Sequence, residues 1–363
     1  MTVTHVFYSG LGGHTSVFWS MFQQADQDYK FKVCLFGIEK PMIETTERCN
    51  DNGIEFSFSL KKGRLDVLHR LRLAKAVFSS KPDVVFLHGS YGILTIYFAC
   101  KIFGAKLVVR ETQAMNLKTK MEQIASNLSL ILSKRMIFLS LDYSKSFLKG
   151  WRKLFSNKTI VIPNGLDLDF FSPQQNMGHR ARIEIGMISR LVPIKDHFTL
   201  IESISILRDK GYSNILLRIA GEGTTEKSLK DQVKAKNLEK YVQFDGLLSQ
   251  KQSAEFLKSL DIYVHSSYGE TMSNSVMQAQ ACALPIVATN VFGINNVIQD
   301  QKNGFLFELG DSKRLVKILE DLIVDESLRL KYGGVSRQYA LDNLSNKVMA
   351  GKYLDIFKSI CKN

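Results

Sequence analysis

Short apolar runs alternate with longer, partly polar segments along almost the whole chain. Several runs are apolar at nearly every position and rich in β-branched residues, which is typical of strands that a parallel sheet buries on both faces. The runs are residues 4–10, 31–37, 83–89, 106–111, 135–141 and 159–165, followed by 183–189, 215–223, 241–246, 261–267 and 284–290. Because segments of helical length separate most of them, the pattern predicts an α/β fold with two doubly wound, Rossmann-like domains.

The apolar pattern is interrupted at residues 172–182, which are polar, contain Pro and Gly, and show no periodicity. We therefore predict an N-terminal domain over residues 1–171, a linker over 172–182 and a C-terminal domain over 183–344. The final segment, 345–363, follows the last helix of the second domain and is free to pack back on the first. Ligands of doubly wound sheets bind at the carboxyl ends of the strands, so we expect a cleft there, between the domains.

Composition fits this division and restricts the setting in which the protein works. With 363 residues, 45% of them hydrophobic and 23% charged, the chain is long enough for two domains with cores of their own. The first residues lack the features of a secretory signal, and the longest apolar run, 91–100, is too short to cross a bilayer. Five scattered cysteines, without metal-like or disulfide-like spacing, fit free thiols in a reducing compartment. We expect a cytoplasmic protein.

The formal net charge of +13 is shared unevenly along the chain. Residues 1–175 hold 23 Lys and Arg against 14 Asp and Glu, a balance of +9, and the remainder holds 25 against 21, a balance of +4. Two segments, 63–78 and 144–158, place apolar residues, including Trp151, among basic ones in a helical pattern. Such segments either turn their apolar side to the domain core or lie on an anionic membrane surface. The charge comes without a nucleic-acid-binding motif, so we expect no nucleic-acid partner.

The first predicted strand runs into a glycine-rich turn, Gly10-Leu11-Gly12-Gly13, followed by His14. Glycines allow backbone N–H groups to approach a phosphate at the start of a helix, where the helix dipole also favours negative charge. Thr15 stands where a dinucleotide fingerprint requires its third glycine, so that fingerprint is absent. Alone, this turn is as compatible with a tight connection as with a phosphate site.

Two stretches of the second domain carry charged residues at predicted strand ends. Arg190 and Lys195 follow the strand at 183–189, where two cations can hold an anionic diphosphate or simply be solvated. Glu270 precedes a polar helix start at residues 271–275, where it can meet a polar ligand or cap the helix. Spacing alone leaves both interpretations of each feature open.

Four pieces of the sequence together resemble the retaining GT-B glycosyltransferases of family 4. They are GLGGH at 10–14, IPNGLDLDFFSP at 162–173, GMISRLVPIK at 186–195 and SSYGETMSNSVMQAQACALPIVATNVFGINNVI at 266–298. The last piece is the most specific, because it is similar to the family's helix with two acids eight positions apart and to the proline and strand that follow. The resemblance implies a nucleotide-sugar donor, most often UDP-linked in the family, held mainly by the C-terminal domain, and an acceptor held by the N-terminal one.

The resemblance also implies roles for charged residues of the C-terminal domain. Arg190 and Lys195 match the pair that binds the donor diphosphate, and Glu270 matches the acid that contacts the sugar. Gln278 falls where the family usually has a second acid, which holds the ribose hydroxyls. Replacing a charged acceptor by a neutral amide costs about 1 kcal/mol of binding, so we expect weaker donor affinity without loss of the reaction.

Backbone groups complete the donor site that the resemblance implies. The amides of Met272, Ser273 and Asn274 receive the phosphates at the helix start, and Gly12 and Gly13 belong to a loop of the N-terminal domain that faces them. Departure of the nucleoside diphosphate develops negative charge that cations and helix N–H groups stabilise. In the retaining reaction of the family the acceptor attacks from the face that the diphosphate leaves, so no enzyme nucleophile is required.

The N-terminal domain offers two further candidates for the cleft. His88 ends a predicted strand, where a histidine is either hydrogen-bonded within the protein or catalytic. The family often has a sugar-facing histidine after the next strand, and Arg110-Glu111 stands there instead, which makes Glu111 the candidate substitute. Asp167 and Asp169 form a D-x-D in what the family has as an ordinary turn. We expect no metal site and no cofactor beyond the nucleotide-sugar co-substrate.

Together these features predict a retaining glycosyltransferase that moves a sugar from a nucleotide-sugar donor to a glycan or polyprenyl-linked acceptor. The resemblance points to bacterial surface-polysaccharide biosynthesis, such as O-antigen, capsule or lipopolysaccharide, at the inner face of the cytoplasmic membrane. Two other functions stay open. One is a GT-B sugar-nucleotide epimerase, which needs no acceptor, and the other is a donor-binding subunit that has lost turnover through Gln278.

Overall fold

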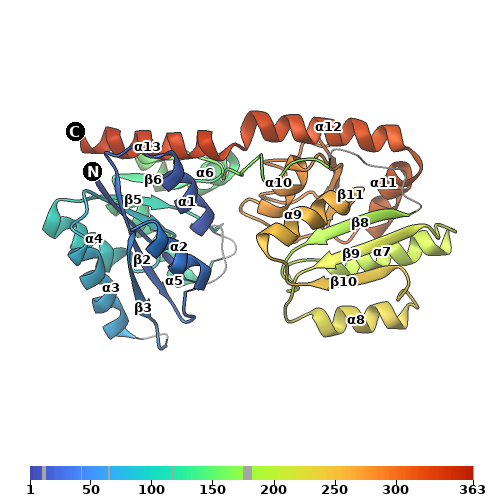
Figure 1. The fold of residues 1–363 in the computed structure, drawn as a ribbon, viewed down its shortest axis with the longest axis horizontal. Helices are drawn as coiled ribbons and strands as arrows, with labels where there is room; N and C mark the ends of the chain where they lie inside the picture. The colour runs from blue at the N-terminus through green and yellow to red at the C-terminus, as the bar shows by residue number, and fades with distance from the viewer. Residues whose placement is uncertain are drawn as a thin grey trace. The chain divides into compact units, whose positions relative to one another are not determined.

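The computed structural model describes residues 1–9, 14–41, 43–63, 66–113, 115, 118–174 and 182–362. It separates into two compact units: unit 1 is Met1–Gly165 with Asn346–Asn363, and unit 2 is Leu166–Ser345. Each unit contains a parallel sheet covered by helices, as Figure 1 shows. The doubly wound α/β architecture predicted from the apolar pattern is confirmed in both units. The linker between the domains was predicted at 172–182. Residues 175–181 of that segment lie outside the described residues.

Unit 1 is built on a seven-stranded sheet in the order β3-β2-β1-β4-β5-β6-β7. The strands are β1 (Thr2–Tyr8), β2 (Lys30–Gly37), β3 (Glu55–Leu60), β4 (Val84–His88), β5 (Lys106–Arg110), β6 (Arg135–Phe138) and β7 (Thr159–Val161). The helices are α1 (His14–Gln24), α2 (Ile43–Asp51), α3 (Val67–Ser79), α4 (Ile93–Phe103), α5 (Lys120–Leu132), α6 (Leu141–Phe147), the 3₁₀ helix η2 (Gly150–Lys158) and α13 (Asn346–Cys361). The strand order reverses between β1 and β4, which is where ligands of such sheets bind.

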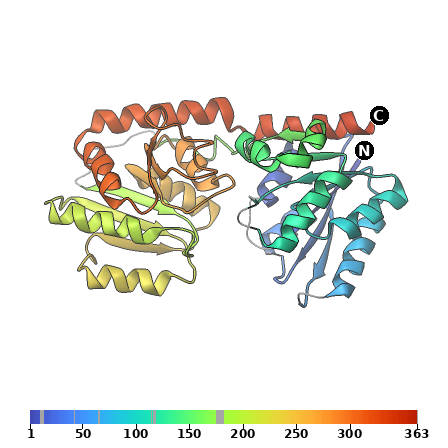
Figure 2. The same ribbon diagram turned by 180° about the vertical axis from the view of Figure 1, so that it is seen from behind.

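Side chains of β1 point alternately into the two cores of unit 1, as the two-residue period of a strand requires. Val3 and Phe7 belong to a core shared with α1 and α13, and Val6 belongs to one on the other face, shared with α3 and α4. Helix α13 lies along α1 (Figure 1), and its buried side chains, among them Tyr353 and Phe357, recur at helical spacing. From behind, Figure 2 shows α3, α4 and α5 on the opposite face of the sheet.

Unit 2 is built on a six-stranded sheet in the order β10-β9-β8-β11-β12-β13. The strands are β8 (Ile183–Ile188), β9 (Ile215–Ala220), β10 (Val242–Gly246), β11 (Ile262–His265), β12 (Ile286–Thr289) and β13 (Phe305–Phe307). The helices are α7 (His197–Asp209), α8 (Glu226–Ala235), α9 (Gln250–Ser259), α10 (Asn274–Ala281), α11 (Ser312–Val324) and α12 (Glu326–Asn343). The order reverses between β8 and β11, so the loops after these strands meet at one edge of the sheet.

One predicted helix is interrupted in the structure. The segment 144–158 forms the end of α6, which stops at Phe147, and then the 3₁₀ helix η2, which begins at Gly150 with a left-handed φ of 62°. Lys149, between the two helices, is extended. No residue of η2 is buried, and Trp151 and Leu154 are 49% and 81% exposed. Their apolar side chains therefore do not face the core. Among the described residues no helix is long and apolar enough to cross a membrane.

Candidate active site

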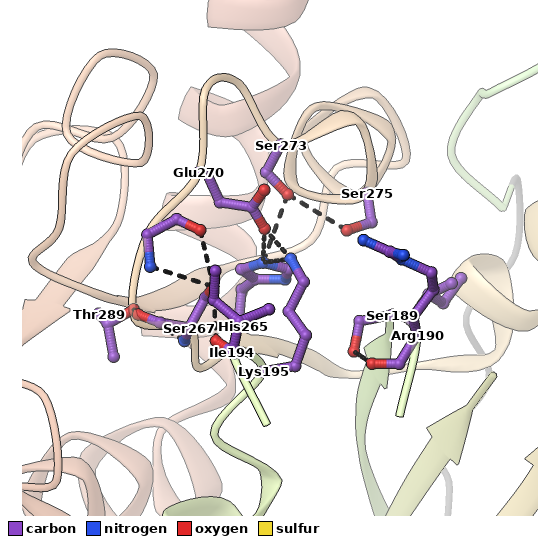
Figure 3. Close-up of polar contacts among 12 residues, drawn as sticks. Ser189, Arg190, Ile194, Lys195, His265, Ser267, Glu270, Ser273, Ser275 and Thr289 are labelled. Carbon is purple, nitrogen blue, oxygen red and sulfur yellow. Dashed lines mark hydrogen bonds and ion pairs between the residues drawn. The ribbon is translucent and has the colours of Figure 1, made fainter. Parts of the chain in front are cut away.

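Two loops of unit 2 bring a small group of polar side chains together at the start of α10 (Figure 3). Lys195 lies in the loop after β8, and His265 is the last residue of β11. Glu270 lies in the loop after β11, and Ser273 is the N-cap residue of α10. Backbone hydrogen bonds join the loops, from the N–H of Asp196 to the carbonyl of Ser266 (3.2 Å) and from Tyr268 to Ile194 (2.8 Å). The site is thus positioned by main-chain pairing at the carboxyl ends of adjacent strands.

Glu270 is held by two partners at the same carboxylate oxygen. The ammonium of Lys195 pairs with Oε1 of Glu270, and Nε2 of His265 lies 2.8 Å from that atom. His265 is completely buried, while the side chains of Lys195 and Glu270 are only 11% and 17% exposed. Nε2 of His265 is also 3.4 Å from the ammonium of Lys195 and from Oγ of Ser273. These four side chains form one polar cluster, which we call the Glu270 cluster.

Burial determines the protonation of the Glu270 cluster. It lowers the pKa of His265 well below the ordinary 6.5, with a further contribution from the charge of Lys195, so His265 is neutral. A neutral ring with Nε2–H can donate to Glu270 while Nδ1 accepts from the Tyr263 hydroxyl, 3.4 Å away. Burial, followed by the nearby charge of Arg190, lowers the pKa of Lys195 to about 7. The contact with Glu270 acts in the opposite direction because it favours the ammonium form.

Arg190 is exposed and extends from the loop after β8 toward the start of α10 and Ser275 (Figure 3). Its loop is supported by the turn after β9. Gly221 has φ of 138°, and a Cβ there would lie 1.9 Å from the carbonyl oxygen of Ser189. Only glycine allows this close approach, which fixes the backbone just before Arg190.

The predicted phosphate site lies at the same helix start. Met272, Ser273 and Asn274 lead into α10, and the hydroxyl of Ser273 does not cap the helix. It contacts His265 and the Ser275 hydroxyl, at 3.4 and 3.3 Å, instead. Gln278 lies on α10, eight residues after Glu270 in the sequence, and is half-buried. Binding of phosphate by these amides, and of ribose by Gln278, stays a prediction.

His265 is the member of the Glu270 cluster that the sequence did not predict. A histidine at the end of a strand was considered only in the N-terminal domain, at His88. The signal was present, because His265 lies within the apolar run 261–267, five residues before Glu270. Strand-end position does not by itself separate a ligand-facing histidine from one hydrogen-bonded in the interior.

The two candidates in unit 1 are both buried and engaged. Glu111 is 1% exposed, pairs with Lys118 at 2.6 Å, and accepts hydrogen bonds from the backbone of Thr112 and Gln113 at 3.0 and 3.3 Å. His88 is 3% exposed, and its Nε2 lies 3.3 Å from Nδ1 of His5. Gly12 and Gly13 lie outside the described residues.

Comparisons with known proteins match this chain to glycosyltransferases. Residues 173–338, most of unit 2, match the model of the family described as glycosyl transferases group 1. It is similar to the Staphylococcus aureus capsular polysaccharide biosynthesis glycosyltransferase CapM, 28% identical over 49% of this chain and 46% of that protein. The chain thus spans less than half of the length of CapM.

Two further similarities extend over more of the chain. The UDP-Gal:α-D-GlcNAc-diphosphoundecaprenol α-1,3-galactosyltransferase of Escherichia coli is 25% identical over 73% of this chain and 72% of that protein. The crystal structure of Anabaena HepE in complex with UDP and glucose aligns with a TM-score of 0.83 at 19% identity, covering 99% of this chain and 100% of that one. The fold is therefore GT-B, as the sequence predicted.

Proposed function

We propose that this protein is a group 1 glycosyltransferase, which transfers a sugar with retention from a UDP-linked nucleotide-sugar donor to a glycan or lipid-linked acceptor. The observation that carries the proposal is the Glu270 cluster, in which an acid, a cation and a buried imidazole meet at the start of α10. The relatives support the choice of substrates. HepE was solved with UDP and glucose, and the E. coli relative uses UDP-Gal and a diphosphoundecaprenol-linked acceptor.

Lys195 and Glu270 cannot keep their mutual contact when a donor binds. Lys195, Arg190 and the start of α10 bind the donor diphosphate, because each favours negative charge. Glu270 is then free to accept hydrogen bonds from sugar hydroxyls, while His265 continues to hold its Oε1 atom. The ion pair of the ligand-free protein thus keeps both side chains near their working positions.

The reaction itself needs no nucleophile from the protein. A hydroxyl oxygen of the acceptor forms the new bond to the anomeric carbon as the bond from that carbon to the diphosphate breaks. The hydroxyl proton passes to an oxygen of the departing diphosphate. Arg190, Lys195 and the helix start stabilise the negative charge that develops there, so the reaction proceeds without a metal ion.

The proposed acceptor would be a precursor of a bacterial surface polysaccharide, handled at the cytoplasmic membrane. Neighbouring helices α3, α4 and α5 and the 3₁₀ helix η2 carry large exposed apolar side chains. They are Leu68, Leu71, Phe78, Leu94, Phe98, Ile102, Met121, Ile124, Ile131, Trp151 and Leu154. Helices α3 and α4 hold four Lys and Arg and no acid. Apolar and basic side chains on one face favour an anionic bilayer, which co-sedimentation with phosphatidylglycerol vesicles tests against phosphatidylcholine vesicles.

Glu270→Gln tests the proposed reaction most directly. The amide keeps the size of the side chain but removes the charge that holds Lys195 and the sugar. We expect release of nucleoside diphosphate, with a diphosphopolyprenyl-linked acceptor, to fall at least about a hundredfold, as for loss of charge-assisted bonds in a transition state. Glu255→Gln, an exposed acid on α9, is the matched control.

The same assay separates the two other functions. An epimerase would convert free nucleotide sugar without acceptor, and a donor-binding subunit would bind UDP-sugar without releasing UDP in the wild-type chain. Wild-type turnover that survives in Glu270→Gln would contradict the assignment of the site.

A further inference from the structure

Unit 1 holds a second cluster of ionisable side chains, which the proposed reaction does not use. It lies at the carboxyl ends of β1, β4 and β5, where the strand order reverses. Its members are Arg110, the last residue of β5, His88, the last residue of β4, and His14, the first residue of α1. We call these three residues the Arg110 cluster.

The guanidinium of Arg110 is buried without a negative partner. The residue is 2% exposed, and its contacts within the described part of the chain are all neutral. It donates to the Tyr353 hydroxyl at 3.1 Å and to Oδ1 of Asn164, and it lies 3.5 Å from Nδ1 of His14. The adjacent Glu111 does not compensate the charge, because it is paired with Lys118.

This arrangement is costly for the protein alone. Arginine cannot lose its proton, so the charge of Arg110 persists inside the unit. A buried charge is destabilising unless an opposite charge offsets its lost hydration. An anionic ligand would supply that opposite charge, and an arginine fork suits the oxygen atoms of a phosphate.

The neighbouring imidazoles are neutral and partly unused. Burial, with a contribution from Arg110, lowers the pKa of His14 to about 3. Burial also lowers the pKa of His88 well below 6.5, with contributions from His14, Arg110 and His5. Nδ1 of His88 is buried without a hydrogen-bond partner, and the rings of His14 and His88 are 5.5 Å apart. Nδ1 of His88 can therefore form a further hydrogen bond.

We infer that the Arg110 cluster binds a phosphate group of a substrate, with Arg110 as its cation and His14 and His88 as added donors. The phosphate is that of the lipid-linked acceptor or that of the donor, and only this choice of source rests on the proposed function. An anion also favours the charged form of both imidazoles, so binding takes up protons and tightens as pH falls. The other titratable groups here, His5 and Tyr353, stay neutral because burial lowers the pKa of His5 to about 3 and raises that of Tyr353.

Sulfate is the probe of choice, because it remains a dianion across the relevant pH range. The full chain carries Arg190→Ala and Lys195→Ala, so that unit 2 does not contribute its own phosphate site. We expect sulfate to shift the NMR signals of the His14 and His88 rings, and its affinity to rise roughly threefold to tenfold between about pH 8 and pH 6. Ring signals that sulfate leaves unmoved would overturn the inference.

Arg110→Gln in that background is expected to weaken sulfate binding at least about tenfold. Arg72→Gln, which removes a half-exposed arginine from the same unit, is expected to change it little. Should Arg110→Gln fail to fold, His88→Asn replaces it and is expected to reduce both the affinity and the pH dependence. Unchanged sulfate affinity in a folded Arg110→Gln chain contradicts the site.

Competition identifies the source of the phosphate. Displacement of sulfate by farnesyl diphosphate but not by UDP assigns the cluster to the acceptor, and the reverse assigns it to the donor. Displacement by neither contradicts a substrate site. Because these experiments require no turnover, they stand or fall separately from the proposed reaction.

Discussion

His265 contacts Glu270, Lys195 and Ser273 through one ring nitrogen and has no exposed surface. It acts on the substrate only through Glu270, so it is a positioning residue. We expect His265→Leu to lower kcat roughly tenfold to a hundredfold, because a hydrogen bond to a charged group contributes about 1.5–3 kcal/mol. UDP affinity, which depends on Lys195 and Arg190, should stay nearly constant.

Steady-state kinetics and UDP titration together check the role of His265. His265→Gln, which keeps an N–H donor, is expected to recover part of the lost kcat. A merely structural role would lower UDP affinity and kcat together and would show no recovery with glutamine.

Lys195 offers a prediction about pH, because its pKa is lowered to about 7. A bound diphosphate favours the ammonium, so the pKa rises on binding and a proton is taken up. UDP affinity should therefore be greatest below about pH 7 and fall above it, by up to about tenfold per pH unit. The terminal phosphate of UDP, with a second pKa of about 6, is almost fully ionised above about pH 7, so its ionisation does not cause this decline.

Lys195→Arg separates this effect from other causes of pH dependence. Arginine keeps its charge at all these pH values, so UDP affinity in this variant should be nearly constant from about pH 7 to pH 9. The measurement is UDP titration calorimetry at several pH values. A decline in the variant as steep as in the wild type would exclude Lys195 as the titrating group.

Residues of the candidate sites differ in how far their roles could be predicted from the sequence. Arg190, Lys195 and Glu270 became candidates through the family resemblance, because they match motif positions beside a recognisable strand end or helix start, and their binding roles stay predictions. The role of His265 could be recognised only in the structure, where the loop after β11 places Oε1 of Glu270 2.8 Å from Nε2 of His265. The missing counter-charge of Arg110 could be recognised only from spatial neighbours, since Glu111 follows it directly along the chain yet pairs with Lys118.

At the scale of elements, the turn after β12 supports the loop that carries Glu270. The N–H of Glu270 donates to the carbonyl of Phe292 at 3.0 Å, and Gly293 follows with φ of 88°. A Cβ at Gly293 would lie 2.0 Å from the carbonyl oxygen of Glu270. Backbone must therefore shift if any side chain is added there.

Gly293→Ala should displace Glu270 and lower kcat at least about tenfold, because small misplacement of a catalytic group is costly. Gly310→Ala is the matched control. Gly310 also has a positive φ, 76°, but a Cβ there would meet nothing within 4 Å. Both variants carry the backbone strain, and only the first carries the clash, so equal kcat values in the two would contradict this account. The measurements are kcat and the thermal unfolding temperature of both variants.

Most elements could be predicted from apolar runs, and the exceptions have physical reasons. Each of the eleven runs overlaps a strand of the structure. Strand β3 was missed because EFSFSL alternates apolar and polar residues at the sheet edge. Strand β13 was missed because its apolar run, FLF, stops at Glu308, whereas that of β7 continues to Ile162. The continuous helix expected over 144–158 was wrong, because α6 ends at Phe147 and Lys149 is extended before η2 begins at Gly150.

At the scale of the whole molecule, buried neutral histidines connect stability to pH in both units. Burial lowers the pKa of His5 and His14 in unit 1 to about 3, and that of His197 in unit 2 to about 4. It lowers those of His88 and His265 as well. Unfolding exposes these rings and restores a pKa near 6.5, so below that pH the unfolded chain binds more protons than the folded one.

Stability should therefore be fully present above about pH 7 and fall as pH decreases, by about 1.4 kcal/mol per pH unit for each such histidine well below its unfolded pKa. Thermal unfolding between about pH 7.5 and pH 5 measures the slope. His5→Phe should reduce it by about one proton, because the ring of His5 lies 4.9–5.5 Å from those of Phe18, Phe31 and Phe86 and a phenyl group suits that environment. An unfolding temperature that does not change with pH, or one equally sensitive in His5→Phe, would mean that the folded protein already accommodates the protonated rings.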